Sequence, residues 1–229
     1  MHGLINRAIQ RFAEDMHGEA LWMAAAEAAQ PGLTGFEAML SYDDALTGRV
    51  IDALAGCTGL PRGMLLEDLG TYLVRHPNTE AIRRLLRFGG ETFAEFLHSL
   101  DDLPDRVGLA VPDLRLPSIE VRDLGPGQFL LSTGPGLPGF GQVLAGMLRA
   151  MADDYGSLAL VVLLDCAGGS ARLSVTVAEA AFAEGRQFVL SAAAGGAGAP
   201  PAASPGGPAA GMAGTGGAPA ACRPGQRVP

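Results

Sequence analysis

Residues 86–104 read Leu-Arg-Phe-Gly-Gly-Glu-Thr-Phe-Ala-Glu-Phe-Leu-His-Ser-Leu-Asp-Asp-Leu-Pro, and this stretch decides how the rest of the chain is interpreted. Gly89-Gly90 is typical of the end of one helix. Thr92 is a suitable cap for the next helix, whose apolar side chains recur at helical spacing at Phe93, Phe96, Leu97 and Leu100. Pro104 has no amide hydrogen, and inside a helix its ring clashes with the preceding turn. We therefore predict that this helix kinks or ends near Asp102.

The chain before this stretch, from residue 1 onward, has the apolar spacing of further helices. Asp43-Asp44 lies where an N-cap is expected, and Pro61 suits a first helical turn. Asn78 is expected to cap a short helix that runs through Leu86. The sequence thus predicts a helical subdomain up to about residue 110.

The pattern changes after Pro117. Residues 118–123, 128–132, 158–165 and 171–177 are predicted strands, and residues 140–155 form an amphipathic helix between the two strand pairs. The predicted fold class is α+β, with an N-terminal helical subdomain and a small C-terminal antiparallel sheet crossed by one helix.

The last part of the chain, residues 191–229, consists almost entirely of glycine, alanine and proline. Such a segment has too little large apolar surface to offset the entropy of an ordered chain. We predict one folded domain over residues 1–190, followed by a disordered tail over residues 191–229.

Five short motifs follow one another in a fixed order: Met1-His2-Gly3-Leu4-Ile5-Asn6, Tyr42-Asp43-Asp44, residues 86–90, residues 96–104 and Arg115-Leu116-Pro117-Ser118. Together they resemble the H-NOX family, the haem nitric-oxide/oxygen-binding domains. The resemblance covers residues 1 to about 190. It implies the H-NOX fold, with haem b held between the helical half and the sheet half, and a role in sensing nitric oxide or another gas.

The resemblance also implies where the haem site should lie. The family's iron-binding histidine falls on Pro104, and its Tyr-x-Ser-x-Arg motif, which holds the haem propionates, falls on Leu130, Ser132 and Gly134. Only Ser132 keeps the family's residue. Leu130 cannot donate a hydrogen bond, and Gly134 has no guanidinium for a carboxylate. Pro117 matches a family proline that presses on the haem, although a turn proline explains it equally well. Two missing motifs on two elements indicate the loss of conventional haem binding.

His98 is the remaining candidate iron ligand on the helix that precedes Pro104. It comes six residues earlier, a rotation of about 240° around a helix, so it should face elsewhere. We expect it at the surface or at a pocket edge. The other histidines, His2, His17 and His76, are expected to face solvent, and no metal site is predicted.

Residues 134–139 read Gly-Pro-Gly-Leu-Pro-Gly, which formally matches the G-x-G-x-x-G fingerprint of dinucleotide-binding domains. The two prolines remove backbone N–H groups that would bind a pyrophosphate. The chain after Asp165 is also too short to complete a doubly wound sheet. We interpret the segment as a strand-to-helix loop.

Composition excludes several classes of protein. No catalytic sequence pattern is present. Acidic pairs such as Asp153-Asp154 are adjacent, so they do not share one helix face, and they are expected on solvated faces or at helix caps. We therefore predict no enzymatic activity. The net charge of -8 disfavours nucleic acid as a partner. A signal segment and a long apolar run are both absent, which predicts a cytoplasmic protein without membrane attachment.

Two functions follow from these observations. In the first, the domain is a haem-dependent gas sensor, with an iron ligand unlike the family's or with a pocket that holds haem weakly. It acts on a histidine kinase or diguanylate cyclase, as the resemblance implies. In the second, it is a haem-free domain of the same fold that binds an apolar ligand or a signalling partner protein. The missing histidine, tyrosine and arginine favour the second for the mechanism, whereas the family resemblance alone implies the haem binding of the first.

Overall fold

The computed structural model describes residues 1–186, so the predicted tail lies outside the described residues. The first half is helical, with α1 (Gly3–His17), α2 (Glu19–Ala29), α3 (Asp44–Thr58), α4 (Arg62–Arg75), the 3-10 helix η1 (Pro77–Thr79), α5 (Glu80–Arg87), α6 (Phe93–His98) and α7 (Leu103–Ala110). The second half contains β1 (Ile119–Gly125), β2 (Gln128–Thr133), α8 (Phe140–Tyr155), β3 (Leu158–Ala167) and β4 (Ser170–Glu179).

Local signals explain most of the helix ends. The Thr92 hydroxyl accepts a hydrogen bond from the Glu95 amide, and the Glu95 carboxylate bonds back to the Thr92 amide, a capping box that starts α6. This helix ends at His98, and Pro104 lies in the first turn of α7, where a missing amide hydrogen costs nothing. The predicted break near Asp102 is therefore confirmed. The prediction that Asn78 caps the next helix is wrong, because Asn78 lies within η1.

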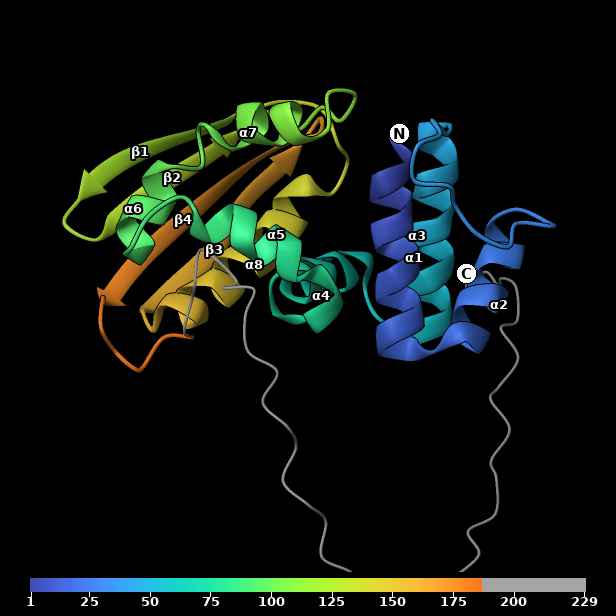
Figure 1. Ribbon diagram of the computed structural model, residues 1–229, viewed down its shortest axis with the longest axis horizontal. Helices are drawn as coiled ribbons and strands as arrows, with labels where there is room; N and C mark the ends of the chain where they lie inside the picture. The colour runs from blue at the N-terminus through green and yellow to red at the C-terminus, as the bar shows by residue number, and fades with distance from the viewer. Residues whose placement is uncertain (187–229) are drawn as a thin grey trace, which may run out of the picture.

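The four strands form one antiparallel sheet in the order β1-β2-β4-β3, which confirms the α+β fold class. Figure 1 shows α6, α7 and α8 on one face of this sheet, with α1–α3 standing to one side and α4 between the two groups. Apolar residues of the sheet alternate toward these helices, for example Phe129, Leu131, Leu173 and Val175.

The two halves meet where α4 crosses α8. A Cβ atom on Gly70 of α4 would overlap the carbonyl oxygen of Val143, and a Cβ atom on Gly146 of α8 would overlap that of Glu67. The two backbones thus approach as closely as glycine allows. Val143 also packs against the buried cores of both halves, so α4 and α8 join the helical unit to the sheet.

Candidate functional site

Pro104 occupies the position that the resemblance assigns to the family's iron ligand. It is half-buried in the first turn of α7. Its neighbours Leu103 and Val107 are buried in the same core as Leu131 of the sheet. The inner side of α7 therefore presents the apolar side chains of Leu103 and Val107, and neither these nor the Pro104 ring has a nitrogen that can bind iron.

Leu130 and Ser132 lie on β2 but on the face of the sheet opposite the core. Their neighbours Phe129, Leu131 and Thr133 are buried, so the alternation of the strand turns Leu130 and Ser132 outward. Ser132 lies opposite Glu120 on β1 and Arg172 on β4, and Leu130 lies opposite Arg122 and Ser174. The sequence pattern alone could not predict this orientation, which depends on which face of the sheet the helices cover.

Gly134 and Pro117 lie side by side at the start of the loop that leads into α8. The Gly134 amide donates to the Ser118 carbonyl oxygen at 2.9 Å. Pro117 is buried, and its Cγ would lie 3.1 Å from a Cβ on Gly136. The loop ends at Gly139, which has φ of 89° and caps α8. Since the sheet is wholly antiparallel, the interpretation of residues 134–139 as a strand-to-helix loop is confirmed.

His98 lies over the β1–β2 hairpin. Its Nε2 atom is 3.6 Å from Asp123 Oδ1, and its side chain is 52% exposed. Its ring packs edge-on against Phe129 with 5.5 Å between the ring centroids. These contacts place the imidazole at the surface, as expected.

The other three histidines also have structural partners, and each is half-buried, which corrects their expected exposure. His2 accepts a hydrogen bond from the Leu4 amide and caps α1, and His17 packs edge-on against Phe12. His76 accepts from the Asn78 amide at 3.3 Å and stacks on a tyrosine. Within residues 1–186, no three His, Cys, Asp or Glu side chains form a group that could hold a metal ion.

A haem group needs an iron ligand and cationic partners for its propionates. Pro104, Leu130 and Gly134 supply neither, and the four histidines lie in other contacts. The side chains at the family's positions therefore do not fit haem.

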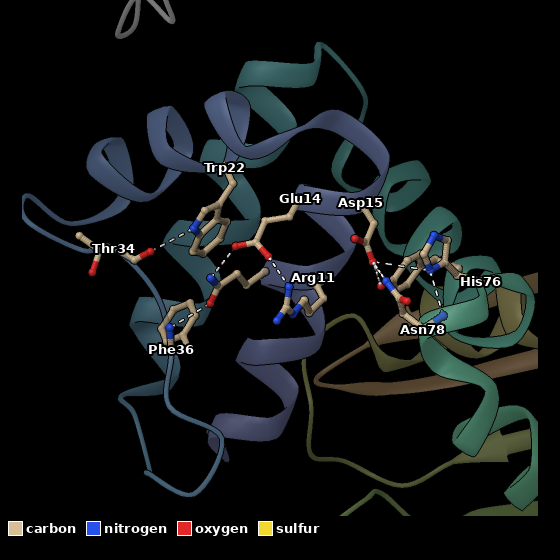
Figure 2. Close-up of polar contacts among 10 residues, drawn as sticks. Arg11, Glu14, Asp15, Trp22, Thr34, Phe36, His76 and Asn78 are labelled. Atoms are coloured by element: carbon tan, nitrogen blue, oxygen red, sulfur yellow. Dashed lines mark hydrogen bonds and ion pairs between the residues drawn. The ribbon is translucent and has the colours of Figure 1, made fainter.

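A polar contact joins the end of α1 to α4 and η1. Figure 2 shows Asp15 of α1 facing Asn78 and His76. The Asp15 carboxylate accepts hydrogen bonds from the Tyr72 hydroxyl at 2.6 Å and from the Asn78 side-chain amide at 2.9 Å. These two hydrogen bonds lower the pKa of Asp15, and burial together with the same carboxylate raises the pKa of Tyr72.

Tyr72→Phe should remove the strongest of these hydrogen bonds and destabilise the domain by about 1 kcal/mol at neutral pH. Because the pKa of Asp15 is below its usual 3.8 in the folded state, its stabilising effect is present above that pH and is lost as the pH falls through the folded pKa. Urea unfolding at neutral and acidic pH measures the difference in unfolding free energy between the unaltered chain and the Tyr72→Phe variant. This difference should become smaller in acid. Tyr42→Phe, which removes a hydroxyl bonded to the Glu37 amide, is the matched control. A Tyr72→Phe loss that stays constant in acid would contradict the assignment to Asp15.

Asp154, near the C-terminal end of α8, is a buried charge that sequence reasoning missed. It is 2% exposed, and its Oδ1 atom accepts from Arg83 Nε at 2.9 Å. Arg87 Nε lies 3.7 Å from Oδ2, and the Arg87 guanidinium lies 3.9 Å from the centre of the Tyr155 ring. Burial raises the pKa of Tyr155 to about 12. Asp154 is thus no solvated residue, which corrects the sequence prediction, whereas Asp153 beside it is exposed.

The haem-NO-binding (HNOB) family model matches residues 2–161. Soluble guanylate cyclase 89Da of Drosophila melanogaster is 20% identical over 176 residues, which cover 75% of this chain and 26% of that protein. Soluble guanylate cyclase gcy-31 of Caenorhabditis elegans is 27% identical over 118 residues, 52% of this chain and 17% of that protein. The chain therefore spans at most about a quarter of these curated relatives.

Solved structures agree on the fold. The Fe(II) unliganded H-NOX protein from K. algicida superposes with a TM-score of 0.67 at 15% identity, over 78% of this chain and 97% of that one. The I5F mutant of T. tengcongensis H-NOX superposes with a TM-score of 0.65 at 11% identity, over 79% of this chain and 99% of that one. None of the described helices combines the length and the hydropathy of a membrane-spanning segment. The match of the family model over most of the chain shows that this protein belongs to the haem-NO-binding, or H-NOX, family, which is related to the gas-sensing soluble guanylate cyclases.

Proposed function

We propose that this domain is a sensory or regulatory module that retains the H-NOX fold and acts on a signalling partner without the family's iron–histidine bond. The observation that carries the proposal is Pro104 in the first turn of α7, at the position that the resemblance gives to the iron ligand. Proline cannot bind iron, so a signal that breaks or strains that bond has no counterpart here.

The outward position of Leu130 and Ser132 supports the same proposal. A propionate clamp requires charged or hydrogen-bonding side chains toward the cofactor, and the inner face of β2 presents Phe129, Leu131 and Thr133. The Thr133 hydroxyl is already bonded to the Ala171 amide, and none of the three carries a positive charge. In such a domain the ligand is an apolar molecule, or the partner protein binds the surface directly.

The partner is proposed to be a cytoplasmic signalling enzyme, such as a histidine kinase or diguanylate cyclase, with no role for nucleic acid or a membrane. The curated relatives named above are guanylate cyclases, of which the chain matches 26% and 17% of the length. The domain itself is proposed to have no catalytic activity.

Absorption spectroscopy tests the proposal. The purified chain, reconstituted with haem, should show no stoichiometric Soret band, with or without nitric oxide. Pro104→His places an imidazole in a turn that needs no amide donor, and with Leu130→Tyr and Gly134→Arg it tests whether a latent haem site exists. Pro112→His, at an exposed proline just after α7, controls for a histidine on the surface.

A stoichiometric Soret band in the unaltered chain that shifts with nitric oxide would overturn the proposal and restore the haem sensor. His98→Ala would then be the first variant in the search for the ligand. A band that appears equally in the Pro104→His and Pro112→His variants would indicate surface binding only, and would leave the absence of a family-type haem site in place.

A further inference from the structure

β3 forms one edge of the sheet, and within residues 1–186 only β4 pairs with it. It is ten residues long, and its outer face carries the β3 stripe, defined as Leu158, Leu160, Val162 and Leu164. All four side chains are exposed, Leu160 to 65% and Leu164 to 54%. Long apolar edge strands of this kind pair readily with another chain, and proteins that remain monomeric interrupt them with charges, prolines or bulges.

The backbone groups that β3 presents to its open edge follow from the pairing of β4. The Val177 amide of β4 donates to Gly127 beside β2, so the odd-numbered residues of β4 face β2 and the even-numbered ones face β3. Thr176 and Ser174 pair with Leu160 and Val162, whose backbone groups therefore point toward β4. The backbone groups between and beside them, at Ala159, Val161 and Leu163, point toward the open edge.

A second copy of β3, running antiparallel about a two-fold axis at Val161, matches this edge residue by residue. Ala159 then lies opposite Leu163 of the second copy, and Val161 lies opposite its own equivalent, so the open N–H and C=O groups face each other. On the outer face Leu160 lies opposite Val162 of the second copy. Leu158 lies near Leu164 of the second copy, at the bulge that follows Leu163.

The charges around β3 are compatible with this pairing. No charged residue occurs from Leu158 to Leu164. Asp165 falls at the end of the paired region, opposite Ser157, and Arg172 lies 3.7 Å from its carboxylate. Like charges are therefore not brought together along the strands, as they would be in a poorly matched self-association.

We propose that the β3 edge is a self-association surface, through which two copies of this chain form a two-fold dimer with one continuous eight-stranded sheet. The interface is isologous, because the same strand supplies both sides. The proposal does not depend on haem binding, so it can fail or succeed independently of the proposed function.

Arg149 of α8 contacts the backbone at this edge. Its Nη2 atom donates to the Val161 carbonyl oxygen at 3.0 Å, which confirms that this carbonyl faces outward, and its guanidinium also pairs with Glu67. A carbonyl oxygen has two lone pairs, so Val161 can accept from Arg149 and from the second copy together. Since Glu67 balances its charge, Arg149 remains compatible with the two-fold axis.

Sedimentation velocity of the full chain over a dilution series tests the proposal. The expected species is a dimer of twice 23.4 kDa. Leu160→Glu should raise the dissociation constant about tenfold, because a carboxylate replaces the apolar partner of Val162 at two symmetric positions of the dimer. Leu124→Glu, at an exposed leucine of the opposite edge strand β1, should leave the dimer unchanged. A monomer at every concentration, or a dissociation constant that Leu160→Glu leaves unchanged, would overturn the proposal.

The register has its own test. Val162→Lys alone should weaken the dimer to a similar extent. In an equimolar mixture with the Leu160→Glu variant, the introduced ammonium lies opposite the introduced carboxylate, and a mixed dimer should form. If both variants are monomeric and their mixture is monomeric too, the two-fold register about Val161 is wrong.

Discussion

Asp154→Ala is expected to destabilise the domain by about 3 kcal/mol or more, which is the usual effect of removing one partner of a buried ion pair. The Asp154 side chain is 1% exposed and that of Arg83 is 5% exposed, and they lie 2.9 Å apart. Without this carboxylate, Arg83 keeps the partly exposed Glu80, whose Oε1 atom is 3.2 Å from Nη1. The contact with Glu80 cannot replace a carboxylate that is wholly inside the protein, since burial of a charge is costly unless it is well paired.

Urea unfolding followed by far-ultraviolet circular dichroism measures this loss. Asp153→Ala is the matched control because its carboxylate is exposed and pairs with the exposed Arg75. Exposed ion pairs contribute about 1 kcal/mol or less to the free energy of unfolding. Asp153 and Asp154 are neighbours in sequence, so the two variants share helix position and composition and differ in burial. Similar losses in both would show that the contact of α5 with α8 does not depend on the Asp154–Arg83 pair.

The helical half of the fold was predictable because its signals are local. The Thr92 cap, the break before Pro104 and the strands that follow Pro117 all depend on residues a few positions apart. The order of helices followed by strands then determines the α+β class. The prediction that Asn78 is a helix cap was wrong because His76 competes for the same turn. The side chain of His76 caps η1 instead.

Features that depend on long-range packing could not be predicted. The sequence places Asp154 beside Asp153 in an acidic pair, and only the contact with α5, 71 residues away, shows which carboxylate is buried. The apolar run from Leu158 to Leu164 is typical of a strand buried on both faces. In the structure one face of this strand is exposed, and the strand lies at an edge of the sheet. The orientation of Ser132 depends likewise on which face of the sheet the helices cover. For the haem positions, the sequence identified the residue types and the fold supplied their surroundings.

Gly70→Ala and Gly146→Ala should each destabilise the domain by about 2 kcal/mol, although alanine is intrinsically the better helix former by about 1 kcal/mol. The added Cβ atom would overlap a backbone carbonyl of the facing helix, Val143 for Gly70 and Glu67 for Gly146. Backbone cannot rotate out of the way as a side chain can, so α4 and α8 must move apart. Gly63→Ala, on α4 where a Cβ atom meets nothing within 4 Å, should instead stabilise the domain slightly.

The double variant distinguishes a shared contact from two separate ones. Gly70 and Gly146 lie on opposite sides of the same α4–α8 crossing, so helices already separated by one added methyl group should accommodate the second at lower cost. The loss in the double variant should therefore be smaller than the sum of the single losses, measured by the same urea unfolding. Strict additivity would mean that each helix adjusts locally, and that the crossing does not hold the helical unit to the sheet as one rigid contact.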